Sequence, residues 1–186
     1  FLCAYFLRHL PSLAREGAFS YTLPWIPSLD INYALYADGL SLLFGLIVSG
    51  MGALVVLYSI YYLPRQKEAL GNFYVYLLLF MGAMMGLVFS DNIMVLYLFW
   101  ELTSISSFLL IAYWYQRQSS RVGAQKSLLI TVFGGFAMFA GLLLLANMAD
   151  SFSIREIIAQ APLLSGEALF IPAMLLVLLG AFTKSA

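Results

Sequence analysis

Charged residues, cysteine and histidine are scarce in this sequence of 186 residues. Only 10% of the residues are Asp, Glu, Lys or Arg, whereas a water-soluble domain averages about 25%, so a water-soluble domain is excluded. Nine basic residues balance nine acidic ones, and this balance leaves no argument for an electrostatic nucleic-acid binder. The single cysteine, Cys3, excludes an intrachain disulfide and a multi-cysteine metal site.

Motifs of enzyme chemistry are lacking as well. The sequence contains no P-loop, no GxSxG motif and no cluster of His, Cys and carboxylate residues at metal-ligand spacing. We therefore predict neither an enzyme nor a cofactor, and the sequence identifies no metal site. Acidic residues other than Glu101 all lie at or beyond the ends of apolar runs, so no oxygen-rich sodium site is predicted either.

Long apolar runs dominate the sequence instead, and 63% of its residues are hydrophobic. A transmembrane helix needs about 20 mostly apolar residues. The runs are continuous and do not alternate with a period of two, which favours helices over barrel strands. We predict an all-α polytopic membrane protein, with residues 1–186 forming one membrane domain segment. The predicted transmembrane helices are 40–62, 72–89, 92–115, 125–148 and 168–186.

The two ends of the chain resemble interrupted helices. Residues 1–8 are apolar but too short to span a bilayer, which predicts the end of a truncated helix. The last run stops without a cap or a polar flank. We therefore expect a segment of a larger protein.

Two segments between apolar runs predict structure outside the membrane. Within the outer loop 9–39, β-prone stretches flank Trp25–Asp30 and predict a hairpin. Ser153 and Glu156 match a capping box. This match predicts a short surface helix from residue 154 to 160, which Pro162 ends.

The distribution of basic residues predicts the orientation of the chain. Two short loops on one side carry four Lys or Arg residues, and short loops with such an excess face the cytoplasm. These loops are 63–71, with Arg65 and Lys67, and 116–124, with Arg117 and Arg121.

A charged residue at the bilayer centre costs about 2.5 to 3.5 kcal/mol even on lenient scales, so such residues usually serve transport. Glu101 lies about nine residues into its run, close to the middle of the bilayer at about 1.5 Å per residue. Tyr97 and Ser104 share its helix face and are candidate supporting groups. For Thr103, Ser106 and Ser107 we predict helix packing, and the GxxxG motif of Gly82 and Gly86 also predicts a close helix contact.

Two lysines also lie within the apolar runs. Lys184 is about 16 residues into the last run, so a continuous helix places it in the cytoplasmic half of the bilayer. Small residues over 180–185 predict that this helix is discontinuous, which brings the ammonium closer to the centre. Lys126 begins its run, and its side chain either reaches the headgroups or joins a proton path.

Three stretches resemble one known family. They are Tyr36–Phe44, Phe99–Leu102 and Gly180–Ala186. In this order they are similar to the antiporter-like subunits shared by complex I and the Mrp-type multisubunit cation/proton antiporters. The sequence of Trp100–Leu110 is most similar to the A subunits of the Mrp antiporters.

The resemblance implies a site, a location and partners. In the family, a glutamate of the fifth helix pairs with a lysine of the seventh, and the matching residues are Glu101 and Lys184. A further family lysine falls on Lys126. The resemblance also implies a bacterial cell membrane, other membrane subunits of the same complex as partners, and H⁺ and Na⁺ as transported ions.

Three functions are compatible with these observations. The first is the proton-translocating part of a multisubunit Na⁺/H⁺ antiporter, in which a buried Glu101–Lys184 pair controls proton loading. The second is a proton-pumping membrane subunit of complex I. The third is a structural scaffold subunit in which the same two residues form a static ion pair that joins helices.

Overall fold

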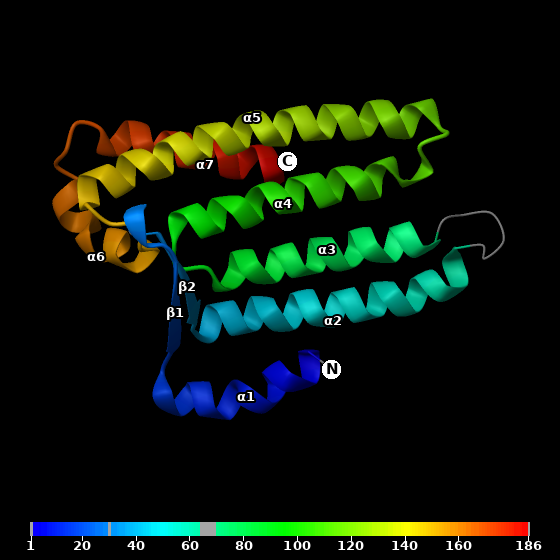
Figure 1. Cartoon of the computed structure of the whole chain (residues 1–186), viewed down its shortest axis with the longest axis horizontal. Coiled ribbons are helices and arrows are strands. Elements are labelled where there is room, and N and C mark those ends of the chain that lie inside the picture. Colours follow the sequence, from blue (N-terminus) through cyan, green and yellow to red (C-terminus); the bar gives the residue numbers. More distant parts are fainter. Residues whose placement is uncertain (1, 30, 64–69, 186) are drawn as a thin grey trace.

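The computed structural model describes residues 2–29, 31–63 and 70–185, and within them helices run side by side (Figure 1). Four helical segments are long and apolar enough to cross a membrane, as the all-α polytopic prediction requires. A further apolar helix, α7 (Phe170–Ser185), has 16 residues. The four long segments are α2 (Gly39–Tyr62), α3 (Leu70–Phe89), α4 (Ile93–Ile111) with the 3-10 turn Ala112–Trp114, and α5 (Gln118–Ala149).

The N-terminal helix α1 (Leu2–Glu16) is longer than the sequence predicts. The apolar run ends near residue 8, but the helix continues until Gly17, whose positive φ of 82° stops it. The Phe6 ring stacks on Phe89 with ring centroids 5.6 Å apart. Helix α1 packs against α2, and this ring contact reaches α3 (Figure 1).

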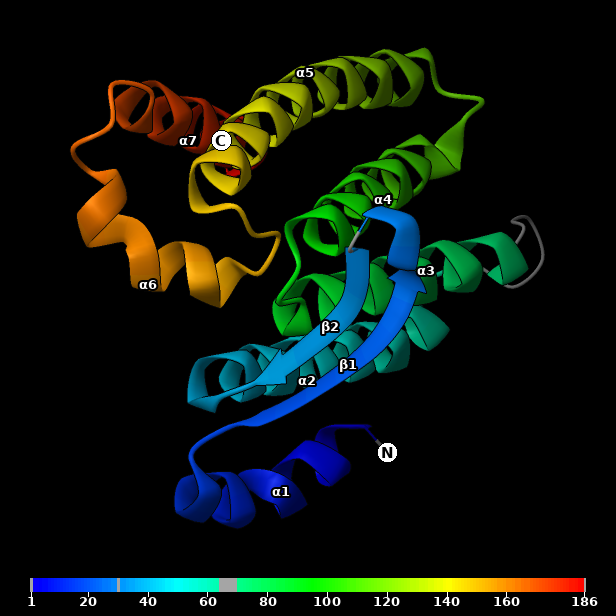
Figure 2. The same ribbon diagram turned by 60° about the vertical axis from the view of Figure 1, so that its left-hand side comes forward.

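An antiparallel hairpin lies in the segment where the sequence predicts one. Strand β1 (Phe19–Ile26) pairs with β2 (Ile31–Ala37), and a bulge follows Pro24. The hairpin crosses the ends of α2 and α3 (Figure 2). We call this end of the helices the hairpin end.

Side-chain caps set the start of two long helices at the hairpin end. Asp38 Oδ1 accepts a hydrogen bond of 2.8 Å from Ser41 N, and Ser41 Oγ accepts one of 2.7 Å from Asp38 N, which completes a capping box. The Ser41 N–H lowers the pKa of the Asp38 carboxyl, because it stabilises the charged form. At the start of α4, Asn92 Oδ1 accepts from Met94 N at 2.9 Å.

The short turn between α3 and α4 is tied to its neighbours at the hairpin end. The Asp91 N–H donates to the β2 carbonyl of Ala34 at 2.9 Å, and the Asp91 carbonyl accepts from Ile154 N at 3.0 Å. The Asp91 carboxylate is buried and pairs with Arg155 Nε at 3.0 Å. The Arg155 guanidinium also lies 3.9 Å from the centre of the Tyr36 ring. These contacts join the hairpin, the turn and the start of α6.

The surface helix α6 (Ile154–Leu164) does not end at Pro162, so that prediction was wrong. Proline removes one N–H, but the Ser165 N–H still donates to the Ala161 carbonyl at 3.0 Å and sustains the last turn. Only half of the predicted capping box forms. The Ser153 hydroxyl accepts from Glu156 N, whereas the Glu156 carboxylate accepts from the Ser151 hydroxyl.

Helix α5 begins at Gln118, so most of the predicted loop 116–124 is helical. With 32 residues the helix is about 48 Å long, well beyond the roughly 30 Å of a bilayer core. A helix need not stop where its apolar run stops, because polar residues sustain it in the headgroup region. The charges of the other predicted basic loop, Arg65 and Lys67, lie outside the described residues.

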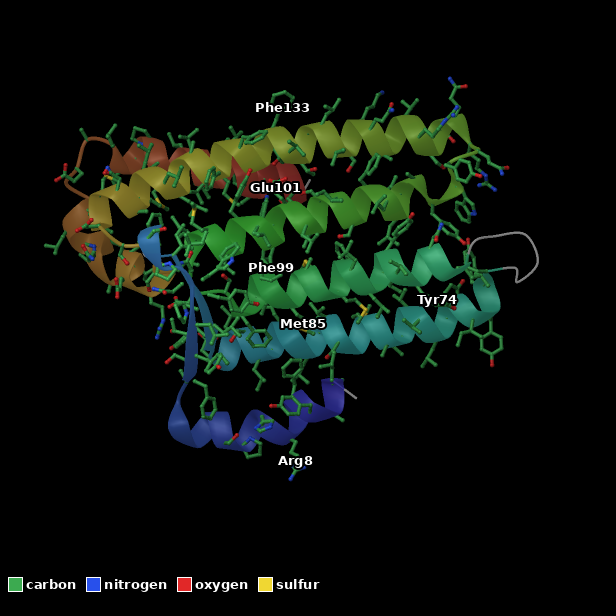
Figure 3. All side chains as sticks on the ribbon, in the orientation of Figure 1. Arg8, Tyr74, Met85, Phe99, Glu101 and Phe133 are labelled. Atoms are coloured by element: carbon green, nitrogen blue, oxygen red, sulfur yellow. The ribbon has the colours of Figure 1, made fainter. Side chains whose placement is uncertain are left out.

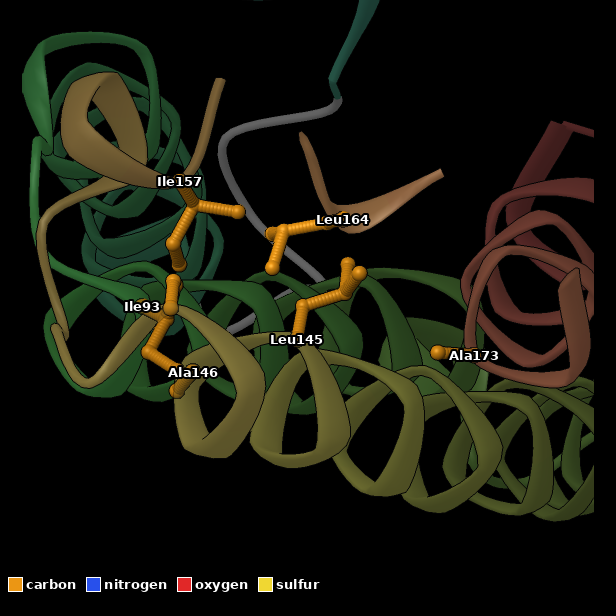
Figure 4. Close-up of a cluster of buried hydrophobic side chains, with 7 residues drawn as sticks. Ile93, Leu145, Ala146, Ile157, Leu164 and Ala173 are labelled. Carbon is orange, nitrogen blue, oxygen red and sulfur yellow. The ribbon is translucent and has the colours of Figure 1, made fainter. Parts of the chain in front are cut away.

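Helix α7 runs without interruption from Phe170 to Ser185, so the predicted break over 180–185 is absent from this described helix. A cluster of buried apolar side chains joins α7 to α4, α5 and α6 near the hairpin end (Figure 4). The cluster fixes the depth at which α7 enters the bundle. Its members are Ile93, Leu145, Ala146, Ala149, Ile157, Leu164 and Ala173.

Candidate functional site

Helix α4 presents Glu101 to α5, about 12 Å along the helix from Ile93. In Figure 3 the residue lies between α4 and the helices α5 and α7. Its Oε1 is buried, has no hydrogen-bond partner among the described residues, and lies against the backbone at Gly135. A larger residue than glycine at position 135 would overlap with this oxygen.

Tyr97 lies one turn before Glu101 and interacts with its carboxylate. The Tyr97 ring stacks on Phe139 of α5, with ring centroids 4.2 Å apart. This stacking holds the phenol on the side of α4 that faces α5. Tyr97 therefore contacts Glu101, as their shared helix face predicts.

Glycines bring α7 close to α5. An added Cβ at Gly180 would lie 2.6 Å from the Gly134 carbonyl oxygen, and one at Gly141 would lie 2.6 Å from the Ala173 carbonyl oxygen. Such distances leave no room for a side chain, so the two backbones pack directly. This close approach sets where Lys184 lies, one turn after Gly180.

The Lys184 ammonium is surrounded by oxygen atoms of α4. It donates to the Trp100 carbonyl at 2.7 Å, to the Ser104 hydroxyl at 2.9 Å and to the Thr103 hydroxyl. It also lies 4.5 Å from the centre of the Trp100 ring. Because helical side chains lean toward the N-terminus, the ammonium lies nearer the hairpin end than its own Cα. An unbroken α7 thus still reaches the level of Trp100.

Glu101 and Lys184 do not form a direct ion pair. Among the described residues, Asp91 and Arg155 are the charged pair within 4.0 Å. The charges of Glu101 and Lys184 interact over a longer distance. The structure therefore brings Lys184 of α7 to groups of α4 that neighbour Glu101, without joining the two charged residues.

Lys126 lies apart from this group. It is exposed, two turns into α5 and toward the end opposite the hairpin. No contact with Glu101 or Lys184 joins it to them among the described residues. Its position fits a side chain that extends toward the headgroups.

The sequence predicts helix packing for Thr103, but its hydroxyl contacts Lys184. The available signal was the spacing of Trp100, Thr103 and Ser104 at i, i+3 and i+4, which places all three on one side of the helix. By contrast, Ser106 is fully buried and donates to the Leu102 carbonyl of its own helix, which fits packing. The sequence did not predict that glycines form the contact between α5 and α7.

The family model described as NADH:quinone oxidoreductase/Mrp antiporter, TM matches residues 90–186, which include Glu101, Lys126 and Lys184. The chain belongs to this family. A second model, described as NADH-Ubiquinone oxidoreductase (complex I), chain 5 N-terminus, matches residues 24–74. The matches agree with the family resemblance of the sequence motifs.

Among curated relatives, the A subunit of the Na(+)/H(+) antiporter of Alkalihalophilus pseudofirmus is 59% identical over 185 residues. The alignment covers 100% of this chain but 23% of that protein. The chain is thus a homologue of the antiporter A subunits and spans under a quarter of this relative. The predicted resemblance to the A subunits is confirmed.

Two solved structures share the fold of this family member. A chain of the Mrp complex from Dietzia sp. DQ12-45-1b superposes with a TM-score of 0.87 at 32% identity, over 100% of this chain and 20% of that one. A chain of respiratory complex I from Thermus thermophilus gives a TM-score of 0.65 at 26% identity, over 84% of this chain and 32% of that one. The fold is therefore that of a membrane subunit shared by both kinds of complex.

Proposed function

We propose that this chain is the proton-translocating part of the A subunit of a multisubunit Na⁺/H⁺ antiporter. The observation that supports this most is the Lys184 ammonium, which three oxygens of α4 hold inside an apolar helix bundle. Buried ionisable groups in membranes usually serve ion or proton transfer. The names of the relatives supply the transported ions, Na⁺ and H⁺.

Lys184 carries the transferable proton in this proposal, and Glu101 controls how tightly it is held. The affinity of an amine for a proton depends on its solvation and on its distance from a carboxylate. A movement of the Lys184 side chain along α4 changes both. Tyr97 positions the Glu101 carboxylate, and Lys126 exchanges protons with the solvent at the other end, with water bridging the gap to Lys184.

The proposal includes partners, orientation and location. The partners are the other membrane subunits of the antiporter, in a bacterial cell membrane. The segments 63–71 and 116–124 face the cytoplasm, so the hairpin end faces outward. Arg117 and Arg121 support this orientation, because they lie at the end opposite the hairpin.

The test is proton and sodium flux in everted vesicles that contain the whole complex, with assembled complex quantified in the same membranes. We expect Glu101→Gln to abolish exchange at full assembly. The matched control is Glu167→Gln, which makes the same change at an exposed residue between α6 and α7. Flux that falls only in proportion to assembly identifies Glu101 as part of a structural scaffold and contradicts the proposal.

The proton-pumping subunit of complex I is the second candidate. Its supporting observation is the fold shared with the complex I chain at 26% identity. The 59% identity to the A subunit of an antiporter favours the antiporter. Quinone-dependent proton pumping by the intact complex, in place of Na⁺/H⁺ exchange, would select complex I.

A further inference from the structure

We infer that Thr103 and Ser104, with the Trp100 carbonyl, form a docking position for the Lys184 ammonium that is separate from Glu101. We call these three groups the α4 cradle. The inference rests on the proposed function, because it names where the proton-carrying amine resides when it is not at the carboxylate. Thr103 and Ser104 are positioning residues, since they act through Lys184.

The cradle satisfies the ammonium without help from a carboxylate. A lysine ammonium has three donors, and the cradle provides three acceptors, at 2.7 Å for the Trp100 carbonyl and 2.9 Å for the Ser104 hydroxyl, with the Thr103 hydroxyl as the third. The Trp100 ring adds a cation–π contact at 4.5 Å. Every donor of the amine is therefore occupied.

The cradle is built by the fold. Thr103 and Ser104 are 1% and 3% exposed. Both hydroxyls donate to the Trp100 carbonyl, at 2.7 and 3.3 Å. With their hydrogens directed there, their lone pairs are left to accept from Lys184. The arrangement therefore recognises a donor cation.

A second acceptor for the same ammonium lies on the next residue of α4. Glu101 Oε1 is buried and has no hydrogen-bond partner among the described residues. Lysine has a flexible four-carbon side chain, and the two acceptor sets belong to neighbouring residues of one helix. The amine can therefore move between the neutral cradle and the charged carboxylate without movement of the helix backbones.

Removal of the cradle hydroxyls tests the inference. Thr103→Val keeps the shape of the side chain and Ser104→Ala shortens it by one atom. Hydrogen bonds to charged groups contribute strongly, so the double variant should lower exchange per assembled complex about tenfold or more. Thr103→Ser, with Ser104 unchanged, retains both hydroxyls and should exchange at about the wild-type rate.

Matched controls come from hydroxyls that contact only their own helix. Ser106→Ala changes a fully buried serine of α4 whose hydroxyl bonds the Leu102 and Thr103 carbonyls. Thr131→Val changes a threonine of α5 that bonds the Ser127 and Leu128 carbonyls. Both should exchange within about twofold of wild type. Exchange by the cradle variant equal to that of these controls overturns the inference.

A stability cycle separates positioning from packing. The melting midpoint of the purified complex should fall on cradle removal when Lys184 is present, and should not change in a Lys184→Met background, where no ammonium needs acceptors. An equal fall in both backgrounds assigns the hydroxyls to helix packing and overturns the inference. The single variants Thr103→Val and Ser104→Ala provide the same cycle if the double variant does not assemble.

Failure of the proposed function gives a different result. If Lys184→Met exchanges normally, the lysine carries no transported proton and the proposed function is wrong. If Lys184→Met is inactive while the cradle variant matches the controls, the proposed function stands and the cradle is wrong.

Discussion

The close approach of α5 and α7 predicts that Gly180→Ala impairs this protein. The added Cβ would lie 2.6 Å from the Gly134 carbonyl oxygen and would also overlap with Met138. Ordinary carbon contacts need about 3.5 Å, so α7 has to move by about 1 Å. The obstacle is backbone, which cannot rotate away as a side chain can.

The magnitude follows from two opposing terms. Overpacking costs about 1 to 3 kcal/mol, and replacing glycine by alanine within a helix contributes about 1 kcal/mol. The net destabilisation is therefore about 1 kcal/mol. The larger effect is on the site, because a shift of about 1 Å stretches the Lys184 bonds, at 2.7 and 2.9 Å, beyond the normal range of roughly 3.2 Å.

The assay is the melting midpoint and the Na⁺/H⁺ exchange rate of the purified whole complex. Gly82→Ala is the matched control, since an added Cβ at Gly82 meets no described atom within 4 Å. We expect Gly180→Ala to lower both quantities and Gly82→Ala to lower neither. Equal behaviour of the two variants would refute the packing argument.

Two further predictions concern the hairpin end. Asp38→Ala removes the cap of α2 and should lower the stability by about 1 kcal/mol at neutral pH. Hydrogen bonding lowers the pKa of the Asp38 carboxyl in the folded protein. The stabilisation is therefore present above the pKa of the unfolded chain, about 4, and is lost as the pH falls through the lowered pKa of the folded state. Melting midpoints that differ equally at pH 7 and at about pH 2 contradict this reasoning. Arg155→Ala leaves the buried Asp91 carboxylate without its ion pair. It should lower the stability of the complex by about 1 to 2 kcal/mol, a value reduced for solvent screening because Arg155 is half exposed. Arg121→Ala, at an exposed residue, should leave the stability unchanged, and equal melting midpoints of the two variants would show that the ion pair is not stabilising.

The helices could be predicted from the sequence because a membrane span is a matter of length and apolar composition. The ends of the helices were harder to predict. The apolar run that predicts α5 starts at residue 125, but the helix starts at Gln118, since polar residues sustain a helix outside the lipid. Pro162 predicts the end of α6, yet the helix continues to Leu164. The Ser165 N–H still donates to the Ala161 carbonyl, so the proline removes one hydrogen bond without ending the helix.

The site could be located from the sequence because Glu101 and Lys184 are costly to bury. The direct partner of Lys184 could not be predicted. Glu101 and Thr103 lie on different sides of α4, and the choice between them depends on how α7 is rotated against α5. That rotation follows from Gly134 and Gly180, which are recognisable only when both helices are seen together. The predicted contact of the GxxxG motif is found at Gly86, where an added Cβ would overlap with Phe99 of α4, whereas an added Cβ at Gly82 meets no described atom within 4 Å.

Sodium-driven proton uptake by the purified whole complex in proteoliposomes tests most directly whether Lys184 carries a transported proton, as we propose. Lys184→Ala should assemble, because the amine sits at the end of α7 and not in the glycine contact, and should show no uptake above protein-free vesicles. Uptake by Lys184→Ala at the wild-type rate per complex would contradict the proposal and place the proton path elsewhere in the complex.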